Sequence, residues 1–551
     1  MREFRIQSTA AAAPAIGAPR TKLRLLVRAH ALGAQGWTLA AIAVLAYVIA
    51  VVRLSPLPLQ DLPTHLARAV VMDDLLFHGG THFGGVYHFH LLLIPYLLGD
   101  LFLTGAVHLF GPTAASALWG VFVLLSLPCA ILLYLRLARL PIDRRPLLIL
   151  LSLYLATDWF FAMGFVNFRI AIAMTLTTLG LVSALRRHWS RGLFAIYVCA
   201  VLLDYLMHLS AAVFLPAAVG VGALLRFRWR TTRLRTELLL AAPLAAVLLW
   251  NFTVADSYRL PSDLVEGPFV WGTLHSKFTE LSTVFLRYQT PAEKVMLLGF
   301  VLCLILLAGR VRWQQLRRPQ LLEPLALAAT FFAIYFLLPH HYTDASYVDV
   351  RALPYVAIFI VLACAQVDDD RSSSIQTRMV VALTLAGALA FANLADLTEV
   401  LIRNNTFVTQ YRNVAAAIPE RARVLPVFTL RREGNVRPLL HVNSFVTIDR
   451  AGVIPYEFAG DNGNVVRYFR YLHLPDAPLE GWYLFPQVLR PDWNSIACDY
   501  DYLIVTQPFA AKRIEVSTQT VAQNEAAALL AIDRQTCASA MHEDFAASQP
   551  E

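Results

Sequence analysis

The chain has 551 residues, of which 57% are hydrophobic and only 15% are charged. This composition, with a mean hydropathy of +0.55, excludes an ordinary soluble globular protein and indicates a polytopic membrane protein. The formal net charge of +8 does not indicate a nucleic-acid partner, because the basic residues are mostly arginines in short runs between apolar segments, as in cytoplasmic loops.

Residues 1 to 36 contain an Ala/Pro-rich stretch and six basic side chains. No small-residue cleavage site follows the first apolar run. This segment is therefore predicted to be a disordered cytoplasmic tail before an uncleaved membrane anchor.

Residues 37 to 400 contain apolar runs near the ~20 residues that a bilayer core demands. Eleven are predicted to span the membrane, at about 37–53, 113–135, 147–163, 168–185, 193–208, 209–225, 238–254, 294–309, 321–338, 351–367 and 379–398. A further run, 89–110, is interrupted by Pro95, Asp100 and several histidines. Counting it as a span would place the basic loop 136–145 on the outer side, against the positive-inside rule. We therefore predict an interfacial or re-entrant helix there, with a twelfth span as the alternative.

The first outer loop, 54–112, carries Gln60-Asp61-Leu62-Pro63-Thr64-His65 soon after the first predicted span. An aspartate kept beside a spanning helix is a functional candidate, because a charge near the bilayer costs free energy. The alternative is that Asp61, with Pro63, only caps the helix that follows. Residues 62–78 interleave apolar and polar side chains, which predicts an amphipathic helix on the membrane surface, roofing a cavity between the spans.

From about residue 401 the composition becomes that of a soluble domain. Helices are predicted at 406–418 and 520–533, and strands at 423–428, 439–448 and 501–506. Together they predict one small α/β extracytoplasmic domain over 401–551. Whether Cys498 and Cys537 form a disulfide there stays open, because an oxidising compartment favours it but spacing does not show proximity.

Three pieces of the chain carry a resemblance to a known superfamily. They are Asp61 to His65 after the first span, the run Leu91 to Phe110 closing on Gly111-Pro112, and Asp158-Trp-Phe-Phe at the outer end of the third span. In this order they resemble the GT-C glycosyltransferases, most closely the protein O-mannosyltransferase and lipid A aminoarabinose transferase branch. The likeness in order and topology covers roughly residues 37 to 400.

The resemblance implies a polyprenyl-phosphate-linked sugar as donor, a site among membrane lipids, and a first-loop aspartate as the acid/base residue. At the matching positions stand Asp61 and, as the second acidic residue, Asp158. Relatives often show Asp-Glu in the first loop, whereas Leu62 follows Asp61 here. A mechanism that needs paired adjacent carboxylates, or a metal held by them, is therefore not supported by the motif.

Glycosyl transfer from a lipid phosphate requires a base for the acceptor hydroxyl and cations for the phosphate that leaves as an anion. Asp61 fits the first role, with His65 four residues further on as a second catalytic candidate. An unpaired carboxylate at Asp158 would be costly, so Arg169 is its expected partner. A purely structural salt bridge near the interface is the alternative for this aspartate.

Four cations are candidates for the donor phosphate. Arg169 and Arg351 lie at the outer boundary, where the positive-inside rule disfavours arginine and where a guanidinium fork suits a phosphate. Arg259 and Lys277 lie in the 255–292 loop and are within possible reach of the same phosphate. The alternatives are snorkelling helix-end anchors for the two boundary arginines and a solvated loop face for the other two residues.

His340, His341 and Asp344 form the densest metal-like cluster, which His65 or His208 would complete from other loops. Adjacent histidines point in different directions on most backbones, so interfacial polar residues that cap the ninth span are the alternative. The sequence makes no cofactor certain; a divalent metal is one option.

These observations predict an α-helical polytopic membrane protein of about eleven spans, in the inner (cytoplasmic) membrane, with a cytoplasmic N-terminus. The predicted function is a glycosyltransferase that acts on the outer side of the membrane. A transporter or flippase, or a polymerase, of lipid-linked saccharides is the alternative. Transporters typically show paired broken helices in related halves, and the sequence has no such internal repeat. The sugar and the acceptor are not identified by the sequence.

Overall fold

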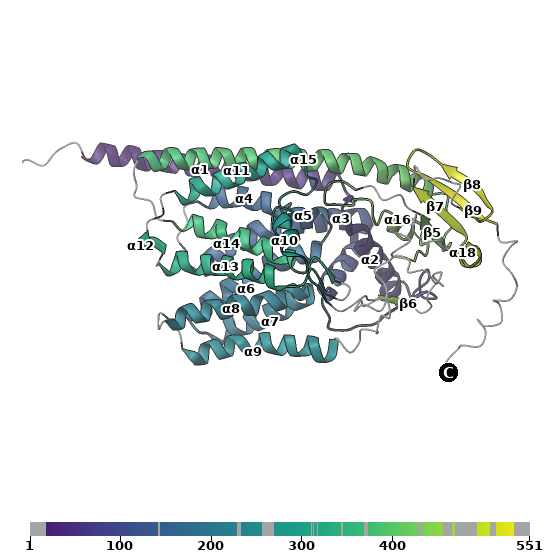
Figure 1. The fold of residues 1–551 in the computed structure, drawn as a ribbon, viewed down its shortest axis with the longest axis horizontal. Coiled ribbons are helices and arrows are strands. Elements are labelled where there is room, and N and C mark those ends of the chain that lie inside the picture. The colour runs from purple at the N-terminus through teal and green to yellow at the C-terminus, as the bar shows by residue number, and fades with distance from the viewer. Residues whose placement is uncertain are drawn as a thin grey trace, which may run out of the picture.

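The computed structural model of the chain describes residues 18–140, 144–228, 233–255, 269–309, 311, 313–316, 318–342, 345–367, 373–427, 432–455, 466–468, 493–506 and 514–533. Most of these residues lie in helices that run side by side along one direction (Figure 1). The polytopic helical fold predicted from composition is confirmed.

Within the described residues, eight helices are long and apolar enough to cross a membrane. They are part of α1 (Ala18–Arg53), α3 (Leu97–Leu137), α6 (Val166–Arg187), α8 (Leu209–Arg228), α9 (Leu234–Trp250) with the start of η1 (Asn251–Ala255), α11 (Pro291–Ala308), α13 (Pro319–Leu337) and part of α15 (Ser373–Ala415). Shorter apolar helices are α4 (Arg145–Ala156) and the segment of η3 (Val350–Ala352) with α14 (Leu353–Ala365). With α7 (Arg191–Met207), every predicted span overlaps a helix of this bundle.

The first helix is longer than its apolar core. α1 begins at Ala18, so it takes in residues 18 to 36 of the predicted tail. This part is rich in Ala, Leu, Lys and Arg, which are strong helix formers and extend a helix that the apolar run has already nucleated. Residues 1 to 17 of the predicted tail lie outside the described residues.

The apolar run 89–110 contains a helix that a non-helical residue, Gly111, separates from the helix that follows, and both carry the label α3. Its first residues follow a short strand, β1 (Tyr87–Phe89), and its helical part opens α3, which continues to Leu137. Gly111 interrupts α3 with φ +78° and ψ +167°, a conformation open to glycine, and Pro112 follows it. The first half of α3 packs against α2 (Leu62–Phe77), through contacts such as Thr104 with Met72.

The predicted helix at 62–78 is α2, and its neighbours cover it on more than one side. α3 packs on one side of α2, and α16 (Ser444–Arg450), from the C-terminal part of the chain, packs on another. A two-stranded antiparallel sheet of β1 and β6 (Val466–Tyr468) joins the same two parts of the chain. α2 is therefore largely buried within the protein, and does not merely lie on a membrane surface.

The C-terminal part is built on a four-stranded sheet of order β5-β7-β9-β8. β5 (Val424–Val427) and β7 (Tyr502–Thr506) are parallel, and β9 (Ala527–Ile532) is antiparallel to β7 and to β8 (Thr518–Gln523). α15 leads into this part without a break, so the predicted boundary at residue 400 falls inside a helix. The structure also describes α18 (Trp493–Asp499) beside this sheet.

Two predictions in the C-terminal part are wrong. The predicted helix at 520–533 is the β8–β9 hairpin, in which the Asn524 side chain accepts the backbone N–H groups of Ala526 and Ala527 and so forms the turn. The Ala-rich sequence favours a helix locally, and pairing with β7 overrides that preference. The predicted strand at 439–448 is a turn followed by α16, which contacts α2 and whose Phe445 and Val446 pack in the apolar core of the C-terminal part.

The structure describes one of the two cysteines, Cys498 and Cys537, that were considered for a disulfide. Cys498 is disulfide-bonded, whereas Cys129, Cys199, Cys303 and Cys364 are free. Cys537 lies outside the described residues.

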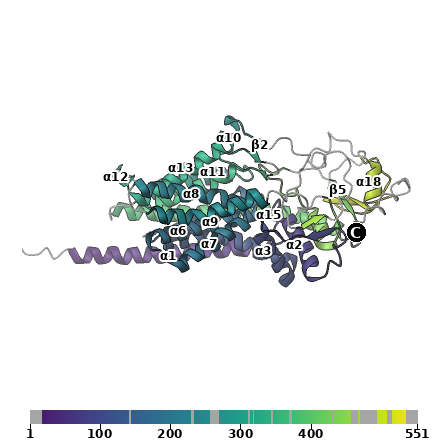
Figure 2. The ribbon, with the colours of Figure 1, turned by 90° about the horizontal axis from the view of Figure 1, so that it is seen from below.

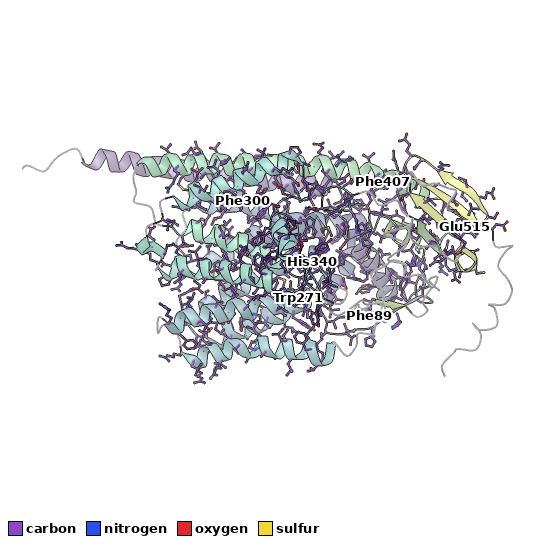
Figure 3. The ribbon with its side chains drawn as sticks, viewed as in Figure 1. Phe89, Trp271, Phe300, His340, Phe407 and Glu515 are labelled. Atoms are coloured by element: carbon purple, nitrogen blue, oxygen red, sulfur yellow. The ribbon has the colours of Figure 1, made fainter. Side chains whose placement is uncertain are left out.

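Two outer connections meet in a small three-stranded sheet. It joins β2 (Phe269–Val270) to β3 (His341–Tyr342) and β4 (Ala345–Ser346), next to α10 (Leu274–Glu280) and α5 (Trp159–Ala162). In perpendicular views, α2, β5 and α18 lie toward one end of the molecule and α12 (Trp313–Leu316) at the other (Figures 1 and 2). Figure 3 shows Trp271 and His340 near the end of the bundle that faces α2.

Candidate active site

The backbone around Asp61 is fixed by the turn that follows α5. The N–H groups of Gln60 and Asp61 donate to the carbonyls of Ala162 (3.2 Å) and Met163 (3.0 Å). Gly164 allows this approach, because it has φ +76° and a Cβ on it would lie 2.7 Å from the Asp61 nitrogen. Asp61 occupies the N-cap position of α2, but its side chain makes no capping hydrogen bond. The geometry therefore does not support the alternative that this carboxylate serves only as a helix cap.

The Asp61 carboxylate is buried, with a residue exposure of 8%, and has weak partners. Gln60 Nε2 donates to Asp61 Oδ1 at 3.1 Å, and His441 Nε2 lies 3.7 Å from the same oxygen. Burial raises the pKa of Asp61 to about 7, against the opposing effects of the Gln60 hydrogen bond and of the nearby Arg351 charge. A carboxylate with this pKa can accept a proton near neutral pH and release it again.

Arg351 lies near Asp61 and has no carboxylate partner among the described residues. Its Nη1 lies 3.2 Å from His208 Nε2, and its Nη2 donates to the carbonyl of Ser346 at 3.2 Å. Its buried Nε has no hydrogen-bond partner. The guanidinium lies 5.5 Å from the ring centre of Phe165 and 5.8 Å from that of Phe168. Aromatic contacts hold the cation without neutralising it, so it can bind an anion.

Asp158 and Arg169 form the pair expected from the sequence. Arg169 Nη1 donates to Asp158 Oδ2 at 2.8 Å, and Nη2 donates to the Leu155 carbonyl at 2.8 Å. Both side chains are at most 2% exposed. Asp158 also caps α5 by accepting the N–H of Phe161. The pair thus holds α5, whose end carries the carbonyls that bind the backbone of Asp61.

His65 lies one turn after Asp61 on α2. Arg68 Nη2 lies 3.1 Å from His65 Nδ1, and Arg68 forms a buried ion pair with Asp100 of α3. Burial, together with the charges of Arg68 and His441, holds the pKa of His65 well below its usual range. His65 is therefore a neutral imidazole at physiological pH, and its neighbour Arg68 ties α2 to α3.

Lys277 is buried and not on a solvated loop face. Its ammonium group donates to the carbonyls of Tyr335 and Leu338, each at 2.8 Å, and to Asp349 Oδ2 at 2.9 Å. An ammonium group has three protons, so all of them have protein acceptors. Lys277 therefore links α10 to the end of α13 and to the loop that leads into Arg351.

The predicted metal-like residues are only partly brought together. His340 Nδ1 lies 3.0 Å from Asp349 Oδ1 and 3.6 Å from Glu280 Oε2, and the hydrogen bond to Asp349 raises the pKa of His340. Within the described residues, the metal-ligating atoms that gather with His340 are those of Glu280 and Asp349, and His341 is not among them. Lys277 already compensates Asp349, which disfavours a metal there. Two predicted site residues lie outside the described residues, Arg259 and Asp344.

The C-terminal part contributes groups that the sequence analysis did not identify. His441 approaches Asp61, and the backbone N–H of Arg437 donates to Gln60 Oε1 at 2.9 Å. The Tyr347 ring packs edge-on against Trp159, with ring centres 4.9 Å apart. No local signal identifies His441, because it lies in a run that was predicted to be a strand and is distant in sequence from Asp61.

The fold and the site together define a class of protein: an integral membrane protein in which loops at one end of the helix bundle and a C-terminal α/β part enclose a buried aspartate. No protein-family model matches the chain, and no curated protein matches it in sequence. Among solved structures, the chain is similar to the crystal structure of ArnT from Cupriavidus metallidurans in the apo state. The TM-score is 0.54 with 12% sequence identity, over 91% of this chain and 99% of that chain. At this level of identity the similarity concerns the fold, and the predicted likeness in fold is confirmed.

Proposed function

We propose that this protein is a membrane glycosyltransferase that moves a sugar from a polyprenyl-phosphate-linked donor to an acceptor on the outer side of the inner membrane. The observation that carries the proposal is the combination of a buried Asp61, with a pKa of about 7, and a nearby Arg351 that has no carboxylate partner in the described part of the chain. The first provides a base near neutral pH, and the second provides a cation for a leaving phosphate. The GT-C-like fold supports the same class of reaction.

In the proposed reaction Asp61 removes the proton from the acceptor nucleophile as that atom attacks the anomeric carbon of the donor. The bond from that carbon to the phosphate oxygen breaks, and the polyprenyl phosphate leaves as an anion. Arg351 receives this charge, while Gln60 and His441 orient the carboxylate. Asp158 acts indirectly, by holding with Arg169 the turn that fixes Asp61.

Among the predicted phosphate ligands, Arg351 fits the proposal best. Arg169 directs its Nη1 and Nη2 donors, and Lys277 its ammonium protons, to protein acceptors. A phosphate bound to either would have to replace those contacts. The proposed phosphate contact therefore rests on Arg351, with Arg169 and Lys277 as positioning residues.

The proposed orientation has the N-terminus in the cytoplasm and the C-terminal part outside. It is supported by the distribution of basic clusters, because α12, the end of α8 and the start of α9 lie at the end opposite α2 (Figure 1). The sequence has arginine runs at these places, which favour the cytoplasmic side.

The test is sugar transfer by purified wild-type protein and by the Asp61→Asn and Arg351→Gln variants. A pool of labelled polyprenyl-phosphate sugars serves as donor and a membrane extract as acceptor. Loss of the base should lower transfer about 10²- to 10⁴-fold, with donor binding retained. Arg351→Gln should lower transfer and, unlike Asp61→Asn, should also weaken donor binding. An exposed substitution far from the site, Gln314→Ala, is the control and should keep wild-type transfer.

Equal transfer by wild type and Asp61→Asn would contradict the assignment of the base. Absence of transfer by wild type, together with movement of the donor across vesicle membranes, would favour a transporter of lipid-linked saccharides. Formation of long saccharide chains would instead favour a polymerase.

A further inference from the structure

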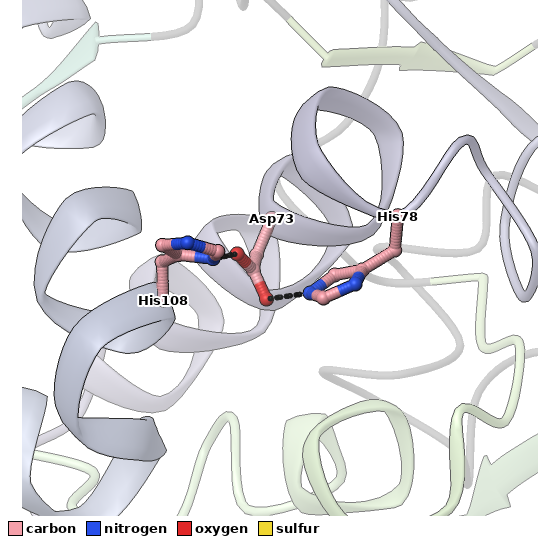
Figure 4. Close-up of side chains that lie close together, drawn as sticks. All are labelled: Asp73, His78 and His108. Carbon is pink, nitrogen blue, oxygen red and sulfur yellow. Dashed lines mark hydrogen bonds and ion pairs between the residues drawn. The ribbon is translucent and has the colours of Figure 1, made fainter.

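A second group of polar side chains lies at the far end of α2 from Asp61. Asp73 lies on the last turns of α2, His78 directly follows the helix, and His108 lies on the first half of α3. The carboxylate of Asp73 stands between the two imidazoles (Figure 4). Its Oδ1 is 2.9 Å from His108 Nδ1, and its Oδ2 is 3.3 Å from His78 Nε2. One ligand atom from each residue lies within 4.8 Å of the others.

We propose that Asp73, His78 and His108 form a divalent metal site of the zinc class. Two imidazole nitrogens and one carboxylate oxygen are ligands that Zn²⁺ prefers, and three protein ligands leave a fourth position for water. Tetrahedral bonds of about 2.0–2.1 Å place ligand atoms about 3.3 Å apart, close to the two distances that Asp73 already makes. Small side-chain rotations are enough to bring the three atoms around one ion.

The charge balance separates this cluster from the group around His340. There, the Lys277 ammonium lies 2.9 Å from Asp349 and already neutralises it. Among the described residues, the charged partners of Asp73 are the two imidazoles alone. A divalent cation would therefore gain a negative ligand without displacing a lysine or arginine.

The surroundings orient the ligands and keep the site open to ions. The ring of Phe77 stacks on that of His108, with centres 4.3 Å apart, which limits rotation of this imidazole. The side chains of His78 and His108 are 53% and 38% exposed, so an ion can reach them from water.

The site is distinct from the proposed active site and does not depend on the proposed function. Twelve helical residues separate Asp61 from Asp73, which corresponds to about 18 Å of helix rise. The bound ion would fasten the end of α2 to the first half of α3. It would therefore act on the helix that carries Asp61 and His65 at its other end.

The test is metal binding by the purified, tag-free full-length protein in detergent, after treatment with a chelator. We expect wild type to retain about one Zn²⁺ per chain after removal of excess metal, measured by mass spectrometry of metals. Replacement of a residue that only supports a ligand typically weakens metal binding about 10- to 100-fold. The double variant His78→Gln/His108→Gln removes two ligands, so its affinity for Zn²⁺ should fall by at least the same factor.

His82→Gln is the matched control, because His82 also pairs with an aspartate, Asp74, at 3.1 Å and is similarly exposed at 44%. It should bind Zn²⁺ as wild type does. Co²⁺ provides a second readout, since a three-ligand site should give the visible absorption of tetrahedral cobalt in wild type and His82→Gln only. Zn²⁺ should also raise the melting temperature of these two proteins and not that of the double variant.

Equal retention of Zn²⁺ by wild type and the double variant would overturn the proposal, as would failure of wild type to retain Zn²⁺. Thermal unfolding of the metal-free double variant at the wild-type temperature would establish that it is folded. If the double variant does not fold, Asp73→Asn, which keeps both histidines and the volume of the side chain, takes its place with the same expected loss.

Discussion

Asp61 and Asp158 are both buried carboxylates, but they have different hydrogen-bond and ion-pair partners. Asp158 has a guanidinium at 2.8 Å, whereas Asp61 has an amide at 3.1 Å and an imidazole at 3.7 Å. The close cation binds Asp158 in an ion pair, whereas Asp61 has no such cation and its pKa is raised by burial. The pairing of Asp158 with Arg169 could be predicted because an unpaired charge near the bilayer is costly. The approach of His441 could not, because it depends on tertiary packing of the C-terminal part.

At the residue level, we expect the rate of transfer to depend on pH through Asp61. A general base must be unprotonated, and the pKa of Asp61 is about 7. The value of kcat/KM should therefore fall about tenfold per pH unit below pH 7 and level off above it. The measurement is initial rate at low donor concentration from pH 5 to 9. The Asp61→Asn variant should not show this fall of kcat/KM below pH 7. A wild-type profile that is flat from pH 5 to 9 would exclude Asp61 as the base.

The same raised pKa predicts an effect on stability. The folded-state pKa of Asp61 lies above the ordinary aspartate value of 3.8, so its contribution to stability is complete below about pH 4 and is lost as the pH rises to about 7. The Asp61→Asn variant cannot ionise at this position, so it does not lose this stability as the pH rises. The melting temperature of the variant minus that of wild type should increase between pH 5 and pH 8, measured in the same detergent. A difference that is independent of pH would mean that Asp61 does not titrate in this range.

At the scale of elements, sequence periodicity predicts the spanning helices well, because each must bury an apolar length set by the bilayer. It fails at 520–533, where an Ala-rich stretch joins a sheet and the turn depends on Asn524. It also leaves the run 89–110 ambiguous. That run becomes the first half of α3, whose place depends on buried contacts with α2 such as the ion pair of Arg68 with Asp100. These are long-range choices that no local pattern records.

The ion pair of Asp158 with Arg169, which holds α5, provides a test at the scale of elements. Asp158→Asn leaves Arg169 buried without a carboxylate, so it should destabilise the protein by about 3–5 kcal/mol. Adding Arg169→Gln removes the uncompensated charge and should restore part of the melting temperature. If Arg169 acts only through the turn, the double variant should keep most of its donor affinity. Loss of donor binding in a stable double variant would instead support Arg169 as a phosphate ligand.

The control for this experiment is the buried pair of Arg186 and Glu237, at 2.7 Å, which joins α6 to the start of α9. Glu237→Gln should destabilise the protein in a similar way. It should leave donor affinity and kcat unchanged in the folded fraction, because this pair lies away from Asp61.

At the scale of the whole molecule, the candidate site forms where distant parts of the chain meet. The first outer loop supplies Asp61, the loop before α14 supplies Arg351, and the C-terminal part supplies His441. These parts gather toward one end of the bundle, and the basic connections lie toward the other (Figures 1 and 2). The charge asymmetry of the sequence predicts the orientation, because it follows a simple rule. Assembly of the site could not, since it depends on how the C-terminal part packs on α2.

This arrangement predicts which positions an impermeant thiol reagent can reach. In a background where Cys129, Cys199, Cys303 and Cys364 are replaced, single cysteines are introduced at exposed positions: Val270 on β2, Thr520 on β8 and Gln314 on α12. In right-side-out vesicles the reagent should label the first two positions directly, because they lie on the side of Asp61. It should label position 314 only after the membrane is permeabilised, because the arginines around α12 retain this end in the cytoplasm. Labelling of position 314 from outside, with positions 270 and 520 protected, would show that the protein has the opposite orientation in the membrane. The proposed site would then face the cytoplasm. The acceptor would then have to be a cytoplasmic molecule.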